Sequence, residues 1–422
     1  MKKILFVMVS IFFIQAGMAF SDETDGLGLF INGDYHKAYP VLLNLAAQGD
    51  MAAQYSLGVM HHKGLGTDQD IELAVKWYRK ASRRGHSAAG MNLEQIYLSR
   101  LTEDGSSLIS DDEAREWYQN KANEGDPQSQ FCLGELYFLG KGVGQDTDAA
   151  LKWFRKSAGQ GNMNAQYRLA MIYDSGKGVE QDSGKAISWF KKSAEQGYEP
   201  AQYQMGLCYH MGTHVKADPS KAFSWYSLAA KKGNAKACYR IGTLYEHGEG
   251  LPRDVAEAAR WYLFAARKGE PEAQYCCGLL SELGKGLPKD DAQAAEWYAR
   301  AAENGVGKAC YSLGVMNELG KGVSVDPGKA MTWYKKAAEQ GYSKAQYNIG
   351  TLFAHGKGVS RDYVQAYKWF SLAAETGLKQ SLEMRNQIEK HMTPKQIDEG
   401  RRLAADWSSR NTAGKGNDSL LR

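Results

Sequence analysis

The stretch "AISWFKKSAEQGYEPAQYQMG" at residues 186–206 returns as "AMTWYKKAAEQGYSKAQYNIG" at residues 330–350, which is 144 positions later. Tryptophan explains this interval, because it recurs with one step of 40 residues and seven steps of 36 residues, and an aromatic residue follows every copy. The nine tryptophans of the repeat are Trp77, Trp117, Trp153, Trp189, Trp225, Trp261, Trp297, Trp333 and Trp369. The quoted repetition therefore spans four periods of a 36-residue unit, and the chain is a tandem repeat.

Each unit contains two amphipathic helical patterns. One pattern, called the second helix of a repeat, is apolar at i, i+3, i+4 and i+8 and stops at a glycine: Ala186, Trp189, Phe190, Ala194 and Gly197. The other, called the first helix, is apolar at i, i+4 and i+7 before the next glycine: Ala201, Met205, Cys208 and Gly212. We expect the tryptophan to fill the space between closely approaching helices. Neither helix buries its apolar stripe alone, so the units are predicted to stack.

Four motifs recur in register over about residues 34–380. They are Ala-Gln-Tyr-x-Met-Gly (201–206), Gly-Lys-Gly-Val (176–179), Lys-Ala-x-x-Trp-Phe (185–190) and Ala-Glu-Gln-Gly (194–197). In these motifs the sequence resembles the Sel-one-like repeat (SLR) family, a relative of the tetratricopeptide proteins. The resemblance implies an all-α fold, a right-handed α/α superhelical solenoid of paired antiparallel helices.

The N-terminus has the pattern of an exported protein. Lys2 and Lys3 precede an apolar run, and Gly17 and Ala19 stand at positions −3 and −1 of a cleavage site. We expect residues 1–19 to be a signal peptide of bacterial type. No cysteine stands directly after the expected cleavage site, so no lipid anchor is indicated. The expected location is therefore periplasmic or secreted.

The repeat frame divides the rest of the chain. Residues 20–50 are predicted to form a partial, capping repeat in which Val41 stands where tryptophan is expected, and residues 51–377 form nine units. Residues 378–408 are predicted to be capping helices, because Thr393, Pro394 and Gln396 suit the N-cap, N1 and N3 positions of a last helix. We expect residues 409–422 to be a disordered tail.

Net charge argues against two classes of partner. The formal charge of +4 falls to 4 − 2 = +2 once the two lysines of residues 1–19 are removed. Nucleic acid or an anionic membrane surface would favour a clearly basic protein. No segment after the N-terminus is apolar enough to span a membrane. A protein or an extended peptide is the expected partner.

The first helices carry a column of aromatic residues and, seven positions later, a mostly acidic column. In related solenoids this face lines the concave surface, so the resemblance suggests a groove that holds an extended, partly basic protein segment. The candidate partner-binding residues are Tyr167, Asp174, Tyr203, His210, Tyr239, Glu246, Tyr275, Glu282, Tyr311 and Glu318. The alternative is that the tyrosines pack between repeats and the carboxylates are merely solvated. The second unit, at residues 97–118, also has an acidic, serine-rich insertion, which is either a contact loop or a tolerated surface insertion.

Short motifs that could indicate catalysis or ligand binding are explained by the repeat. Ser188-x-x-Lys191 matches a motif of penicillin-recognising enzymes, but Thr332-x-x-Lys335 fills the same frame and no Lys-Thr-Gly follows. Cys208, His210 and His214 are three potential zinc ligands, although Cys208 belongs to the apolar column and is expected to point inward. The recurring Gly-x-Gly is expected to be the turn between helices, and His214 replaces one of its glycines. We expect no metal and no cofactor.

The six cysteines are scattered among columns, so we expect no disulfide or one. The sequence favours a non-catalytic protein–protein interaction scaffold of the bacterial envelope or the exterior, in keeping with the link of SLR proteins to host interaction. The alternative is a peptidoglycan-binding or β-lactam-binding protein or a hydrolase. It would need a nucleophile, a base and an orienting group on one surface, which the sequence does not indicate.

Overall fold

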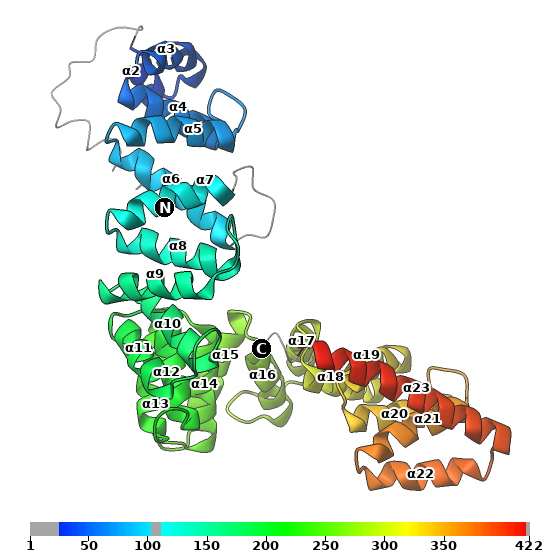
Figure 1. The fold of residues 1–422 in the computed structure, drawn as a ribbon. Coiled ribbons are helices and arrows are strands. Elements are labelled where there is room, and N and C mark those ends of the chain that lie inside the picture. The colour runs from blue at the N-terminus through cyan, green and yellow to red at the C-terminus, as the bar shows by residue number, and fades with distance from the viewer. Residues whose placement is uncertain (1–24, 103–110, 419–422) are drawn as a thin grey trace. The chain divides into compact units, whose positions relative to one another are not determined.

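The computed structural model describes residues 25–102 and 111–418. Over these ranges the chain forms 22 helices and no strand, so the fold is an all-α solenoid. Two compact units divide at Asp182, the first ending there and the second beginning at Ser183. Within each unit the helices follow one another in chain order, and most of them pack on the next one (Figure 1).

The predicted helix pairs are present. The first helices of the repeats are α4 (Met51–Lys63), α6 (Ser87–Thr102), α8 (Pro127–Leu139), α10 (Met163–Ser175), α12 (Glu199–Met211), α14 (Ala235–His247), α16 (Pro271–Leu283), α18 (Gly307–Leu319) and α20 (Ser343–His355). The second helices are α5 (Ile71–Arg83), α7 (Asp111–Asn123), α9 (Thr147–Gly159), α11 (Ser183–Glu195), α13 (Pro219–Lys231), α15 (Val255–Arg267), α17 (Asp291–Glu303), α19 (Pro327–Glu339) and α21 (Tyr363–Glu375).

Atypical helices lie at both ends of the described chain. A short α2 (Gly26–Asn32) precedes α3 (Tyr35–Ala47), while α22 (Lys379–Glu389) and α23 (Pro394–Asp418) pack on α21. The predicted capping box at the start of α23 is present, because the Gln396 side chain accepts a hydrogen bond from the Thr393 amide at 2.8 Å. The helix continues to Asp418, however, past residue 409, where composition predicts disorder. The predicted boundary is wrong because an existing helix extends without a new nucleation step. The predicted signal peptide lies outside the described residues.

Capping residues set the helix lengths. An aspartate precedes eight of the second helices. In α5, α9, α13, α15, α17, α19 and α21 its carboxylate accepts a hydrogen bond from the amide three residues later at 2.8–3.0 Å. The first helices end at the first glycine of Gly-x-Gly, which takes the left-handed conformation, as Gly284 does at φ +64°. The Gly-x-Gly motif is therefore the turn between helices, as predicted.

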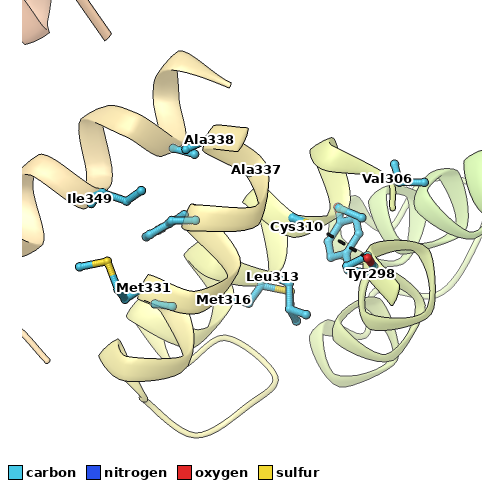
Figure 2. Close-up of a cluster of buried hydrophobic side chains, with 14 of the residues drawn as sticks. Tyr298, Val306, Cys310, Leu313, Met316, Met331, Ala337, Ala338 and Ile349 are labelled. Atoms are coloured by element: carbon cyan, nitrogen blue, oxygen red, sulfur yellow. Dashed lines mark hydrogen bonds between the residues drawn. The ribbon is translucent and has the colours of Figure 1, made fainter. Parts of the chain in front are cut away.

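The core of seven of the nine repeats is an aromatic ring packed on a glycine, which Glu94 replaces in α6 and Ala170 replaces in α10. The fully buried ring belongs to the residue after the tryptophan, such as Tyr298, and not to the tryptophan itself. A Cβ added to Gly278 of the facing first helix would lie only 2.6 Å from the Tyr298 ring. The same contact recurs between Gly58 and Tyr78, Gly134 and Phe154, Gly206 and Tyr226, Gly242 and Tyr262, Gly314 and Tyr334, and Gly350 and Phe370. Figure 2 shows part of one core cluster, in which Tyr298, Met316 and Ile349 come from three different helices.

The tryptophans do not fill the interhelical space as expected. Most of them, including Trp189, are half-buried beside the core. The difference follows from helix geometry, because only one of two adjacent residues on a helix can face the partner directly. The aromatic residue that follows takes that position.

A glutamine amide joins five of the repeats to the helix that precedes them. The Gln202 side chain is buried and donates to the Ala194 carbonyl near the end of the preceding second helix at 3.2 Å. Equivalent bonds of 3.1–3.3 Å run from Gln54, Gln130, Gln166 and Gln274. Cys310 occupies the same column, with its sulfur 3.8 Å from the Ala302 carbonyl oxygen. Each of these carbonyls also accepts the backbone amide of the glycine three residues later, so the glutamine supplies a second hydrogen bond at the helix end.

We expect Gly278→Ala to lower the free energy of unfolding by about 1–2 kcal/mol, because the new methyl group overlaps a fully buried ring. Hydrogen exchange of α16 and α17, together with the urea midpoint, measures the effect. Gly159→Ala is the matched control, since Gly159 is exposed and no heavy atom lies within 4 Å of its added Cβ. The control should be neutral or stabilising by up to about 1 kcal/mol through helix propensity. Equal effects of the two substitutions would contradict the ring-on-glycine account.

His214 is the sole non-glycine with positive φ among the described residues, at +66°. We expect His214→Gly to raise the free energy of unfolding by about 1 kcal/mol, because a left-handed backbone strains any residue that has a Cβ. The midpoint of thermal unfolding reports the change. Gly250→Ala, at the equivalent turn with φ +73° and its Cβ placed 2.6 Å from the Ser220 amide nitrogen, should act in the opposite direction. A destabilised His214→Gly variant would mean that the imidazole contributes more than its backbone strain removes.

Candidate functional site

Three carboxylates occupy one position in successive repeats of the second unit. Glu246, Glu282 and Glu318, called here the carboxylate row, lie in the last turns of α14, α16 and α18 and are half-buried. Each accepts a hydrogen bond from the buried tyrosine hydroxyl of its own repeat, in the pairs Tyr262–Glu246 at 2.6 Å, Tyr298–Glu282 at 2.9 Å and Tyr334–Glu318 at 2.7 Å. The core aromatic residue therefore fixes the orientation of a partly exposed carboxylate.

The protonation state of these tyrosines follows from their burial. Burial raises the pKa of Tyr262, Tyr298 and Tyr334 well above the ordinary value. Each phenol therefore stays protonated at neutral pH and donates a hydrogen bond to the carboxylate. The bond uses one oxygen, Oε2, of each glutamate.

The predicted tyrosine column is half-buried instead of fully exposed. Tyr203, Tyr239, Tyr275 and Tyr311 each pack a ring at 5.6–6.0 Å, centroid to centroid, from the core tyrosine of the same repeat. Their position at the margin of the apolar stripe explains the difference, because aromatic pairs prefer such tilted contacts to solvation.

The ten sequence-predicted residues are divided between the two units. Tyr167 and Asp174 are half-buried residues of α10 in the first unit, and the other eight belong to the second unit. His210 holds the carboxylate position in α12, where its ring contacts the Tyr226 hydroxyl at 3.3 Å. In the four repeats that begin with α12, α14, α16 and α18, the tyrosine of the column and the acidic or histidine side chain contact the same core tyrosine.

The turn of the next repeat reaches this row. The residue between the two turn glycines contacts the carboxylate position of the preceding repeat, at 3.9 Å for Lys321 and Glu282 and at 3.1 Å for Glu249 and His210. The turn residue has the opposite charge where histidine replaces the acid, since Glu249 faces His210 whereas Lys321 faces Glu282. Part of the negative charge of the row is thus balanced within the protein.

Sequence reasoning missed the hydroxyl donors of this site. The signal was available, since Tyr262, Tyr298 and Tyr334 each stand 16 positions after a glutamate of the row. It also missed a buried ion pair in the first unit, where the Arg168 guanidinium binds the Glu135 carboxylate with nitrogen–oxygen distances of 2.6 and 2.5 Å. Burial raises the pKa of Glu135, while Arg168 opposes that rise. Glu135 stands in a column that holds Leu207 and Val315 in other repeats, which was the available signal.

The second repeat differs from the others in its packing. Glu94 occupies the column of the core glycines, and burial raises the pKa of its carboxyl group. A cavity of about 330 Å³ lies among α5, α6 and α7, with Arg83, Trp117 and Lys121 in its lining. Lys121 pairs with Glu124 at 2.9 Å, so the lining contains both signs of charge. The central part of the predicted contact loop, 103–110, lies outside the described residues.

The residues considered for catalysis or metal binding do not form a catalytic or metal site. Ser188 and Lys191 are both exposed on α11, and Lys191 pairs with Glu195 at 3.7 Å. Cys208 is buried, as predicted, and within the described ranges no group of three or more histidine, cysteine or acidic residues is arranged to hold a metal.

All six cysteines are free thiols, and burial raises the pKa of both Cys276 and Cys277 to about 12. A thiol of that pKa is a poor nucleophile at neutral pH. None of the helices that the structure describes is long and apolar enough to cross a membrane.

Two similar solved structures come from bacteria. The chain is 30% identical to a protective antigen present in uropathogenic Escherichia coli strains displaying an SLR fold, covering 94% of this chain and 93% of that chain with a TM-score of 0.51. It is 27% identical to a Sel1 repeat protein from Oxalobacter formigenes, covering 89% of this chain and 98% of that chain with a TM-score of 0.54.

Curated relatives share a shorter stretch. Protein sel-1 homolog 2 of Homo sapiens is 31% identical over 129 residues, which is 28% of this chain and 18% of the relative. An uncharacterized protein of Neisseria meningitidis is 32% identical over 108 residues, which is 26% of this chain and 21% of the relative. The chain thus spans about a fifth of the length of these relatives.

The Sel1 repeat model matches eight segments of the chain, and residues 87–126 fall between the first two of them. The segments are 52–86, 127–162, 164–198, 199–234, 235–270, 271–306, 307–342 and 343–378. Sel1 repeat proteins generally serve as non-catalytic scaffolds for protein–protein interaction. Since the matches cover most of the chain and their aromatic, glycine and glutamine positions make the contacts that join the helices, this protein belongs to the Sel1 repeat family.

Proposed function

We propose that this protein is a non-catalytic interaction scaffold, exported to the bacterial envelope or secreted, that binds an extended protein segment along the first helices of the second unit. The supporting observation is the carboxylate row, whose glutamates are held in a repeating orientation by buried tyrosine hydroxyls. Such fixed acceptors suit recognition, because little side-chain freedom is lost when a partner binds.

The chemistry of the surface favours a partly basic peptide. Each glutamate of the row has one oxygen that the tyrosine does not use, and the neighbouring half-buried rings add apolar area. The turn cation near Glu282 balances part of the charge, so the partner's basic residues would act together with its apolar ones. Export and a place in the envelope or host interaction are supported by the N-terminal charge and hydropathy pattern and by the bacterial origin of the two SLR structures.

The test replaces Glu246, Glu282 and Glu318 together by glutamine. The glutamine oxygen still accepts from the tyrosine, so the fold should persist while three charges are lost. Linear peptides selected on the wild-type protein from a random displayed library serve as probes, with affinity measured by fluorescence anisotropy. We expect peptides rich in lysine or arginine to bind about tenfold or more weakly, since three exposed pairs together contribute about 1–3 kcal/mol.

The matched control changes Glu195, Glu303 and Glu339 to glutamine. These exposed residues near the ends of second helices alter the net charge equally. Peptide affinity should be unchanged in the control. The proposal fails if both triple variants bind alike, because the effect would then be one of net charge and not of the row.

A further inference from the structure

The second helices carry a cation over their tryptophan in five repeats. The lysine or arginine three positions after the tryptophan places its charged group 4.2–4.8 Å from the indole centroid. The pairs are Lys80–Trp77, Lys156–Trp153, Lys192–Trp189, Arg300–Trp297 and Lys336–Trp333. Residues i and i+3 are neighbours on a helix, so this cation covers the exposed part of the ring.

Two consecutive repeats of the second unit replace this cation by a large apolar residue. Leu228 on α13 and Phe264 on α15 occupy the position and are 41% and 45% exposed. The tryptophans three positions earlier, Trp225 and Trp261, are half-buried. We call these four residues the second-helix patch. Five repeats have a cation at this position, the second has Asn120, and the last has Leu372, which is 3% exposed in a buried cluster with Trp369 and Ala404. A large apolar residue kept in water here is unfavourable unless something covers it.

The flank of the patch is basic. Its exposed cations lie within one turn after Leu228 and Phe264 and are Lys231, Lys232, Arg267 and Lys268. No acidic residue occurs within α13, and the one acidic residue within α15, Glu257, is paired with Arg260 at 2.7 Å. Cations at a helix C-terminus also complement the helix dipole. The dipole does not, however, account for the apolar substitutions beside them.

We propose that the second-helix patch docks an acidic protein segment whose apolar side chains cover Leu228 and Phe264 and whose carboxylates meet the basic flank. Charge complementarity identifies the partner class, because the patch has cations on its flank and no unpaired carboxylate within its two helices. The apolar residues stand on two rigid helices one repeat apart, which favours recognition of spaced side chains. This surface is distinct from the carboxylate row, which lies on first helices.

The decisive variant is Leu228→Lys combined with Phe264→Lys. It installs the residue type that other repeats of this chain carry at the same position, so the fold should be retained, as circular dichroism can verify. The probes are again linear peptides from a random displayed library, selected on the wild-type protein. We expect a class of peptides rich in aspartate or glutamate together with leucine, phenylalanine or tryptophan to lose at least about tenfold in affinity.

Two further measurements separate this proposal from its alternatives. The Glu246, Glu282 and Glu318 triple variant should bind the same acidic peptides unchanged, so failure at one surface does not affect the other. Vesicles of phosphatidylglycerol should not bind in a manner that depends on Leu228 and Phe264. The proposal is overturned if no selected peptide depends on these two residues, if the dependent peptides are not acidic, or if the two residues support vesicle binding instead.

Discussion

The contact between a buried aromatic ring and the backbone of a facing glycine determines how the two helices pack in seven of the nine repeats. In the pair Gly278 and Tyr298 the ring occupies the space that any larger residue would need. Protein interiors are close-packed, so this approach fixes the distance and the angle between two helices of a repeat together. The ring also carries the hydroxyl that orients Glu282. Packing and candidate function thus share one side chain.

Coupling between repeats depends on different chemistry. A buried glutamine such as Gln202 bonds to the preceding helix end, and the turn residue of the next repeat reaches the carboxylate row. Each repeat therefore contacts mainly its neighbours, which is the condition for a solenoid. Recognition can vary at exposed positions that take part in neither contact, such as Leu228 and Phe264, whereas the carboxylate row also contributes to the contacts within and between repeats.

The repeat, the helix pairs, the turn glycines and the capping box at Thr393 were predictable, because period and capping chemistry act locally. The identity of the buried aromatic was not, since Trp189 and Phe190 are adjacent and periodicity alone does not say which one faces the partner helix. Hydrogen bonds across 16 residues, such as Tyr298 to Glu282, depend on the interhelical angle and so escape a reading of single helices. The exposure of Leu228 and Phe264 became informative only beside the lysine–tryptophan contacts of the other repeats.

Glu94 has a mechanical consequence. It stands where seven other repeats have the core glycine and α10 has Ala170, so the second repeat lacks the backbone-to-ring contact that joins the helices of the repeats on either side of it. In a linear array, tension along the chain passes through every joint in series, and the weakest joint opens first. The second repeat is therefore expected to open first when the first unit is stretched. The helices α12 to α21 keep their glycine–ring contacts and should retain the spacing of their surfaces.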